Sequence, residues 1–176
     1  MIKAKNILLR PVEEVDLDML FVLESAAFLQ MDNAFFTMES FYKFKQRFYQ
    51  TGFWNDDEGI SLILDKQGRI LGKIEYRKCN SDALTLYFLL YKEEDRGQGY
   101  MGEALPLFAS FLFAIKKINR LQLDIPDYNT AAIAAAQKGG FSFEGIARQA
   151  LFQKGRYLDL CVYSLLREES KPVDKF

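Results

Sequence analysis

The pattern of hydrophobic and polar positions predicts seven strands, each a short apolar or alternating run bounded by turn residues. Two pairs of these strands are joined as hairpins, across the turn 66–69, which contains Gly68, and across Lys154-Gly155. The expected strands are 6–11, 60–65, 70–76, 83–91, 121–125, 141–153 and 157–166. Pro11 and Pro126 end two of them, since proline cannot donate a hydrogen bond to a neighbouring strand.

A helical period predicts helices at 14–28, 37–49 and 129–138, and the apolar stretch that follows the glycine-rich residues and ends at Ile118 indicates a further helix, the third in chain order, because it is too long for an ordinary strand. Thr37 is the expected cap of the second helix and Asn129 that of the fourth. Pro106 lies within the third helix, so we expect it to kink this helix or to restrict its regular part to the far side. The segment 28–37 has no clear period but carries five large apolar side chains, so we expect a loop there.

This order of elements predicts a single α+β domain around a mixed, mostly antiparallel, twisted sheet of about seven strands flanked by about four helices. We expect the domain to cover residues 1–170. The end of the chain, from Arg167, is charged, and we expect it to be frayed, with 171–176 as a tail.

The composition narrows the class of protein. Apolar residues make up 49% and charged residues 27% of the 176, which is typical of a globular domain. The net charge is −1 with scattered basic residues, so we expect no nucleic-acid partner. The longest uncharged apolar run has 12 residues and the N-terminus does not resemble a signal peptide. We therefore expect a cytoplasmic protein with no membrane partner.

The chain has no histidine and only two cysteines, Cys79 and Cys161. This composition argues against a disulfide scaffold, a zinc site, a Ser-His-Asp triad and Cys-His chemistry. We expect no metal.

A glycine-rich stretch, Arg96-Gly97-Gln98-Gly99-Tyr100-Met101-Gly102, separates the strand 83–91 from the helix after it. Glycines between a strand and a helix allow the backbone to hold phosphate on the free N–H groups of the helix start, and Arg96 adds a positive charge. An ordinary strand-to-helix connection is an equally good reading of this stretch alone. A nucleotide-hydrolysing P-loop is not favoured, because Glu103 follows Gly102 where that motif requires lysine.

The residues from Arg96 to Leu105 resemble the coenzyme A signature of the GNAT N-acetyltransferases. The second stretch, from Asn129 to Lys138-Gly139-Gly140-Phe141, resembles that family's second signature. Arg10-Pro11, Glu144-Gly145 and 155–167 are similar to the branch that acetylates ribosomal-protein N-termini and polyamines.

This resemblance implies an acetyl-CoA cosubstrate, bound where the sheet opens beside the strand that ends at Tyr91. The pyrophosphate would lie on the N–H groups from Gly97 to Gly102 and the pantetheine along the strand edge, with Asn129 also at the cofactor. The implied edge residues are Phe88, Leu89, Leu90 and Tyr91.

Two positions depart from the family pattern. Met101 stands where glycine or alanine is usual, so we expect cofactor binding to weaken if its side chain points at the phosphate, and to persist if it packs under the loop. Ala136 stands where the family usually has the tyrosine that protonates the leaving thiolate.

Acetyl transfer to an amine requires a base, a donor for the thioester oxygen and an acid. Glu75 is the preferred base, although a solvated charged face with Lys73 and Arg77 explains it equally well; Glu24, Asp32 and the acidic residues 56–58 are weaker options. A backbone N–H near Leu89 or Leu90 is the expected oxyanion donor. Tyr128 and Tyr91 are candidate acids, with simple packing as their alternative. Asn129 is a further candidate catalytic residue, which plain helix capping also explains.

The sequence therefore predicts an N-acetyltransferase that moves an acetyl group directly from acetyl-CoA to a primary amine, either a peptide N-terminus or a small molecule. We expect the segment 28–36 to supply the acceptor wall, with a satellite hydrophobic cluster as the alternative. A noncatalytic coenzyme A-binding module and a partner-binding domain are the rival hypotheses. A monomer or a homodimer is expected.

Overall fold

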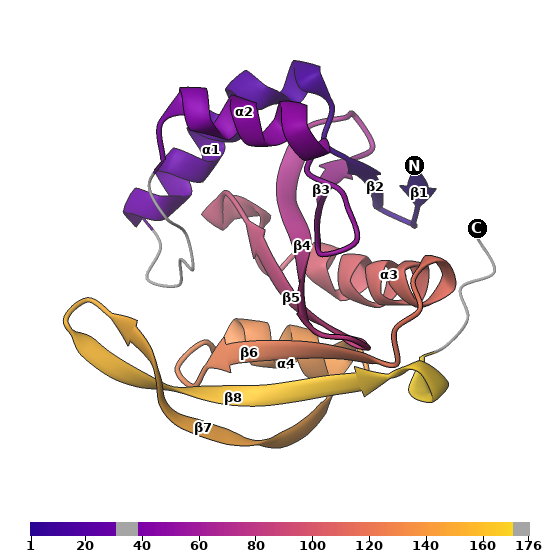
Figure 1. The fold of residues 1–176 in the computed structure, drawn as a ribbon, viewed down its shortest axis with the longest axis vertical. Coiled ribbons are helices and arrows are strands. Elements are labelled where there is room, and N and C mark those ends of the chain that lie inside the picture. Colours follow the sequence, from indigo (N-terminus) through magenta and orange to yellow (C-terminus); the bar gives the residue numbers. More distant parts are fainter. Residues whose placement is uncertain (31–38, 171–176) are drawn as a thin grey trace.

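The computed structural model describes residues 1–30 and 39–170 of the chain. Its strands form one sheet in the order β1-β2-β3-β4-β5-β6-β8-β7 (Figure 1). The strands are β1 (Ile2–Lys3), β2 (Ile7–Pro11), β3 (Glu58–Asp65), β4 (Ile70–Asn80), β5 (Ala83–Leu90), β6 (Arg120–Pro126), β7 (Ser142–Gln153) and β8 (Arg156–Leu166). All neighbours pair antiparallel except β5 and β6, so the expected α+β class is confirmed. The additional eighth strand, β1, has two residues, too few to show a period.

Within the described residues, four α-helices flank the sheet: α1 (Leu17–Gln30), α2 (Phe41–Thr51), α3 (Tyr100–Ile115) and α4 (Thr130–Lys138). A short 3₁₀ turn, Glu14–Asp16, precedes α1. The predicted start of α2 was wrong, because Ser40 caps this helix by accepting a hydrogen bond from the Lys43 N–H at 3.4 Å. The expected cap, Thr37, lies outside the described residues.

Helix α3 runs without interruption through Pro106, so the prediction that proline would restrict its regular part to the far side was wrong. Pro106 is in the second turn and lacks only the N–H that would bond the Gly102 carbonyl. Ala104, Leu105 and Phe108, on either side of the proline, are fully buried in the core. This burial stabilises the helix more than the missing hydrogen bond weakens it.

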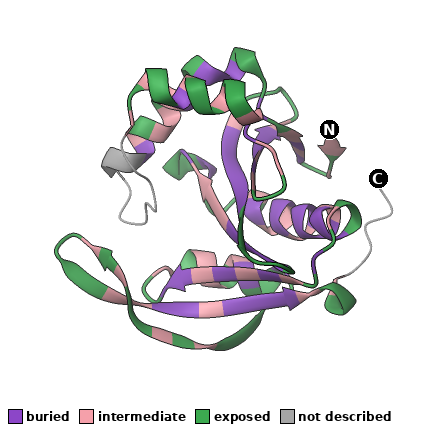
Figure 2. Ribbon diagram, viewed as in Figure 1, coloured by how far each residue is buried: buried purple, intermediate pink, exposed green. Residues whose placement is uncertain are grey.

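Each face of the sheet has its own core. Helices α3 and α4 pack on one face, where Ile74, Tyr76 and Phe108 are fully buried. Helices α1 and α2 cover the other face of β3 and β4, where Leu20, Phe44 and Leu62 meet (Figure 1). The central strands are consequently buried on both sides, whereas much of the β7–β8 hairpin is exposed (Figure 2).

Strands β5 and β6 diverge, and their divergence opens the sheet. The two parallel strands pair at only three positions, from Ala83 opposite Arg120 to Thr85 opposite Gln122. Beyond these pairs the strands separate (Figure 1), and β5 changes from buried to half-buried at Tyr87. The β4 side of β5 stays tightly packed, since a Cβ on Gly72 would lie 2.1 Å from the Leu89 carbonyl oxygen.

The chain after β8 was expected to be frayed from Arg167, but Arg167 is held in place. The Arg167 guanidinium donates hydrogen bonds to the carbonyl oxygens of Phe113, Lys116 and Ile118 at 2.6 to 2.8 Å. The expected tail, 171–176, lies outside the described residues. No helix in the described ranges is both long and apolar enough to cross a membrane.

Candidate active site

The glycine-rich stretch forms an exposed turn that leads from β5 into α3. Gly97 and Gly99 have φ angles of +74° and +86°, in the left-handed region where a side chain is strained. Nothing lies within 4 Å of a Cβ built on either glycine, so the backbone faces open space. The sequence therefore uses glycine here for backbone conformation, not for packing.

The start of α3 presents backbone N–H donors next to the glycine-rich stretch. The first α-helical bond runs from the Glu103 N–H to the Gly99 carbonyl at 3.2 Å, so the N–H groups of Tyr100, Met101 and Gly102 precede the helix's own bonding pattern. Met101 is only 9% exposed and packs in the main core. Its side chain points under the loop, so the departure from the usual glycine or alanine leaves the backbone N–H available.

The beginning of the turn is fixed by an ion pair from another part of the sheet. Arg69, in the β3–β4 turn, forms two hydrogen bonds with the buried Asp95, at 2.7 and 3.0 Å. Asp65 also pairs with Arg69 at 3.0 Å, and these contacts raise the pKa of the guanidinium. Asp95 directly precedes Arg96, so the loop starts from a rigid position.

Lys138 is a cofactor-site candidate that sequence reasoning did not single out, although it belongs to the second signature. Its side chain lies against Gly102, with Cδ 3.3 Å and Nζ 3.6 Å from the position of a Cβ there. This contact brings an ammonium from the end of α4 to the first turn of α3. The sequence contains Lys138 within the second signature, but only the packing of α4 against α3 shows that its side chain reaches Gly102.

The edge predicted for pantetheine runs from Phe88 to Tyr91, and its first three residues belong to the part of β5 that has separated from β6. Tyr91, which follows β5, differs from these three because it is buried in the second core. The Tyr91 hydroxyl donates to Glu24 Oε1 at 2.6 Å, and burial together with this carboxylate raises the tyrosine pKa well above its usual value. A phenol with a raised pKa is a weak acid, so Tyr91 is poorly suited to protonate a thiolate.

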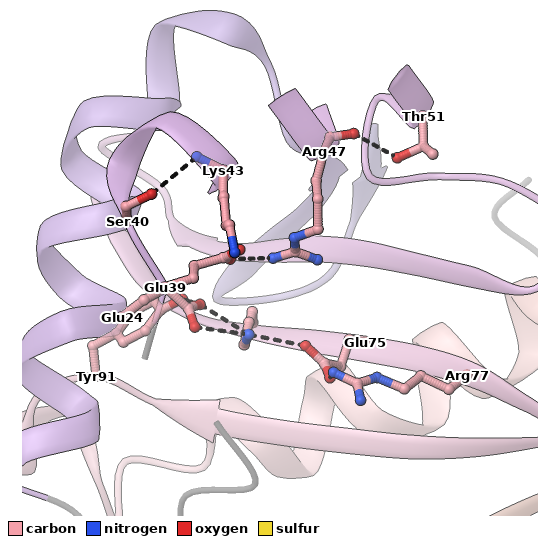
Figure 3. A network of polar contacts seen from close by, with 10 residues as sticks. Glu24, Glu39, Ser40, Lys43, Arg47, Thr51, Glu75, Arg77 and Tyr91 are labelled. Carbon is pink, nitrogen blue, oxygen red and sulfur yellow. Dashed lines mark hydrogen bonds and ion pairs between the residues drawn. The ribbon is translucent and has the colours of Figure 1, made fainter. Parts of the chain in front are cut away.

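Beside this edge lies a buried polar cluster, here called the acidic–basic network, made of Glu24, Lys73, Glu75, Arg77 and Tyr91 (Figure 3). Lys73 Nζ lies 2.9 Å from a carboxylate oxygen of both Glu24 and Glu75. The network joins α1 to β4 and to the end of β5, on the face that α1 and α2 cover. The contacts that join α1 to β4 and to Tyr91 connect residues 49 and 67 positions apart in the chain, so a short stretch of sequence cannot reveal them.

Glu75 is an ionised carboxylate within this network. Although burial opposes its charge, Lys73 and Arg77 hold its pKa below the usual value. Arg77 Nη2 lies 3.1 Å from Glu75 Oε1, and the Arg77 side chain remains 54% exposed. The alternative of a solvated charged face was wrong for Lys73 and Glu75, whose side chains are 5% and 9% exposed, because α1 covers them.

Tyr87 also lies in this region and was not singled out from the sequence. It stands opposite Glu75 in the β4–β5 ladder, two residues beyond the last β5–β6 pair. The Arg77 guanidinium lies 5.5 Å from its ring centroid. Partial burial raises the pKa of Tyr87 despite the opposing effect of Arg77, with Asp124 of β6 among the charges that act on it. Tyr87 thus links the network to the opening between β5 and β6.

The candidates on the α4 side have identified structural partners. Asn129 caps α4 by accepting from the Ala132 N–H at 3.1 Å, as its alternative reading expects. The Tyr128 hydroxyl donates to Gln153 at 2.9 Å. Ala136 is fully buried in the main core, where its methyl group offers no proton.

Of the weaker base options, Glu24 belongs to this network, and Glu58 stands opposite Arg77 in the β3–β4 ladder. Asp57 pairs with Lys78, and Asp56 with Lys116 at the end of α3. Asp32 and residues 31–36 of the expected acceptor wall, 28–36, lie outside the described residues, whereas 28–30 continue α1 instead of forming the expected loop. Within residues 1–30 and 39–170 no group of acidic or cysteine side chains is arranged to hold a metal ion.

The family of the chain follows from comparison with known proteins. A family model described as the acetyltransferase (GNAT) domain matches residues 6–142. The chain therefore belongs to the GNAT acetyltransferase family, whose reaction class is acetyl transfer to an amine.

Individual relatives agree with this family. The chain is 25% identical to a SPbeta prophage-derived uncharacterized N-acetyltransferase, YokL, of Bacillus subtilis, with 94% of this chain and 93% of the relative covered. Its fold is similar to that of the Vibrio cholerae spermidine N-acetyltransferase solved with CoA and spermine, with a TM-score of 0.82, 22% identity and coverage of 93% and 97%. The fold is also similar to RimL, a ribosomal L7/L12 alpha-N-protein acetyltransferase solved with coenzyme A, with a TM-score of 0.77, 22% identity and coverage of 93% and 95%.

Proposed function

We propose that this protein binds acetyl-CoA in the opening between β5 and β6 and transfers the acetyl group directly to a primary amine. The observation that carries the proposal is the continuity of this opening with the glycine turn: the strand that loses its partner after Thr85 leads straight into the exposed donors of α3. A long cofactor with a pyrophosphate and an amide-containing arm fits these two features together.

In this proposal the pyrophosphate binds the backbone from Gly97 to Gly102, assisted by Arg96 and Lys138. The positive end of the α3 macrodipole favours the same negative charge. The pantetheine amides pair with the open edge from Phe88 to Leu90, and a backbone N–H at Leu89 or Leu90 binds the thioester oxygen. The Asn129 side chain contacts the cofactor from the start of α4.

The acceptor amine attacks the thioester carbon, so that an N–C bond forms and the C–S bond breaks. We assign Glu75 to receive the amine proton, directly or through water, because it is ionised and adjoins the open end of β5. Tyr128 is the proposed proton source for the thiolate, in place of the hydroxyl that Ala136 lacks. Cys161 is poorly suited to form a covalent intermediate, because burial raises the pKa of its thiol.

The acceptor we propose is a peptide N-terminus or a small amine. Support comes from the two structural relatives, one solved with spermine and the other described as acting on a ribosomal protein. We further propose a cytoplasmic location, since both cysteines are free thiols, as is usual in a reducing compartment. A monomer or homodimer remains our expectation.

The direct test is to incubate the protein with acetyl-CoA, a panel of peptides and small amines, and a reagent that reports the released thiol. We expect thiol release that depends on the amine, with an acetylated product of matching amount by mass spectrometry. Acetyl-CoA binding by calorimetry with no turnover on any amine would instead favour a noncatalytic coenzyme A-binding module. This module is the rival hypothesis because Ala136 stands where the family usually has the tyrosine acid.

A further inference from the structure

The charges beside the open end of β5 indicate what kind of amine can be accepted. The antiparallel register places Lys73, Glu75 and Arg77 opposite Leu89, Tyr87 and Thr85 on one face of the sheet. An acetyl group held by the edge from Phe88 to Leu90 would therefore meet its acceptor beside these side chains. This argument rests on the proposed function.

Three carboxylates beside this face are already neutralised by the protein itself, and Glu58, opposite Arg77 in the β3–β4 ladder, is a further carboxylate on it. Glu24 and Glu75 share Lys73, Glu75 also pairs with Arg77, and Glu39 pairs with Arg47 at 2.7 Å (Figure 3). These three carboxylates thus face three cations, and Lys43 of α2 adds a further positive charge. A polyamine needs uncompensated anions for each of its additional ammonium groups, and this cluster supplies none.

Arg77 has the properties of an anion receptor at the mouth of the cluster. Its side chain is half exposed, and only one edge of the guanidinium is used by Glu75. The Tyr87 ring beneath it limits its motion. A guanidinium held in this way presents its remaining N–H groups to a carboxylate, which it can bind through two parallel hydrogen bonds.

We propose that the acceptor is a primary amine that also carries a carboxylate, with Arg77 binding the carboxylate and Glu75 facing the amine. The groups that would meet the two ends of this acceptor are adjacent, since Arg77 Nη2 lies 3.1 Å from Glu75 Oε1. An acceptor whose amine and carboxylate are only a few bonds apart can therefore contact both. A peptide with an acidic second residue and a free acidic amino acid are the two sources of this chemistry.

Asp124 of β6 provides the opposing possibility and makes the proposal testable. It lies across the opening and accepts a hydrogen bond from the neutral Gln122 amide at 2.9 Å. A second ammonium of a polyamine could pair with this carboxylate. Preference for a polyamine is therefore the outcome that contradicts the proposal.

The test compares acceptors that differ only in charge. Amidated peptides beginning Ser-Asp, Ser-Asn and Ser-Lys, together with free aspartate and spermidine, are assayed for kcat/KM with saturating acetyl-CoA. We expect the Ser-Asp peptide to exceed the Ser-Asn peptide by about tenfold, the effect of one charge-assisted contact. Free aspartate shows whether the small molecule or the peptide is the better source of this chemistry.

The variant Arg77→Gln should bring the Ser-Asp to Ser-Asn ratio to about one. Because the ratio is taken within one variant, a general loss of activity from disturbing Glu75 cancels. Arg77→Lys, which keeps the charge without the planar fork, should give an intermediate ratio and serves if Arg77→Gln fails to fold. Lys117→Gln, a change of equal charge at an exposed position after α3, should leave the wild-type ratio unchanged.

An unchanged ratio in Arg77→Gln, or a higher kcat/KM for spermidine or Ser-Lys than for Ser-Asp, would overturn the acidic-acceptor proposal while leaving acetyl transfer intact. A complete absence of thiol release with every acceptor would instead contradict the proposed function. The two failures are therefore distinguishable.

Discussion

The glycine turn and the acidic–basic network both adjoin β5, the strand that borders the opening, and they are built in opposite ways. The turn is exposed and offers backbone N–H groups, with glycines at positive φ angles and few side chains involved. The network, apart from the half-exposed Arg77, is largely buried and consists of side chains from α1, β4 and the residue after β5. A phosphate can be recognised by local backbone geometry, whereas an acceptor amine has to be recognised by charges assembled over long range.

The two regions also differ in how they respond to damage. A change in the turn removes a ligand contact but leaves the core intact. A change in the network leaves a buried charge without its partner and therefore acts on folding as well as on activity.

Lys73→Met should destabilise the protein more than any change in the loop. It leaves Glu24 and Glu75 facing each other without the shared ammonium, and removing one partner of a buried pair costs about 3–5 kcal/mol. Urea denaturation of the variant measures this loss of unfolding free energy. The double variant Lys73→Met with Glu75→Gln removes one of the stranded charges and should recover part of it. If Lys73→Met is as stable as the wild type, the network is not a buried charge cluster.

Gly99→Asp should weaken acetyl-CoA binding by about a hundredfold or more while the fold persists. The side chain is strained at a φ of +86° and places a carboxylate where the pyrophosphate is expected. Isothermal titration calorimetry measures the affinity. Gly155→Asp is the matched control, since Gly155 has a φ of +77° and equally open surroundings at the far hairpin turn. Equal affinity in both variants would remove the loop from the cofactor site.

Glu75→Gln should lower kcat by about tenfold to a hundredfold, because it removes the proposed proton acceptor. The pH midpoint of kcat/KM above neutrality should stay in place and follow the pKa of the acceptor amine, because ion pairs hold the pKa of Glu75 below 4.5 and keep it ionised there. Assays with two amines of different pKa measure the shift. A midpoint that moves with the variant instead of the amine would assign the titration to Glu75.

The same lowered pKa has a consequence for stability, with a defined sign. The ion pairs of Glu75 contribute fully above its unfolded pKa, and their contribution is lost as the pH falls through the lower folded value. Wild-type stability should therefore decline below about pH 4.5, and the decline should be shallower in Glu75→Gln. Denaturation midpoints between pH 3 and 7 give this comparison.

Lys138→Gln should have the smallest effect, raising the KM for acetyl-CoA by about threefold to tenfold, the range of one partly exposed charge contact. The increase should diminish at high salt, as screening reduces the contribution of the ammonium. Lys117→Gln is the matched control with an unchanged KM. An effect of Lys138→Gln that is independent of salt would indicate a packing role against Gly102 instead.

Much of the fold could be predicted because its elements carry local signals. The cap Asn129 at a helix start and the glycines Gly68 and Gly155 in hairpin turns each follow from rules that act within a few residues. The errors also have local causes. Helix α2 was predicted to start at Thr37, but Ser40, three residues later, caps it, and β1 was too short to show a period.

The candidate site divides in the same way. The glycine turn and the second signature could be recognised from the sequence alone, because each lies within one short segment and depends on residue types and their spacing. The packing of Met101 in the core, the approach of Lys138 to Gly102 and the burial of Glu75 beside Lys73 and Arg77 are visible only in the folded chain. The physical reason is that burial and charge pairing depend on which distant elements pack together, and the residues of a single strand do not specify that packing.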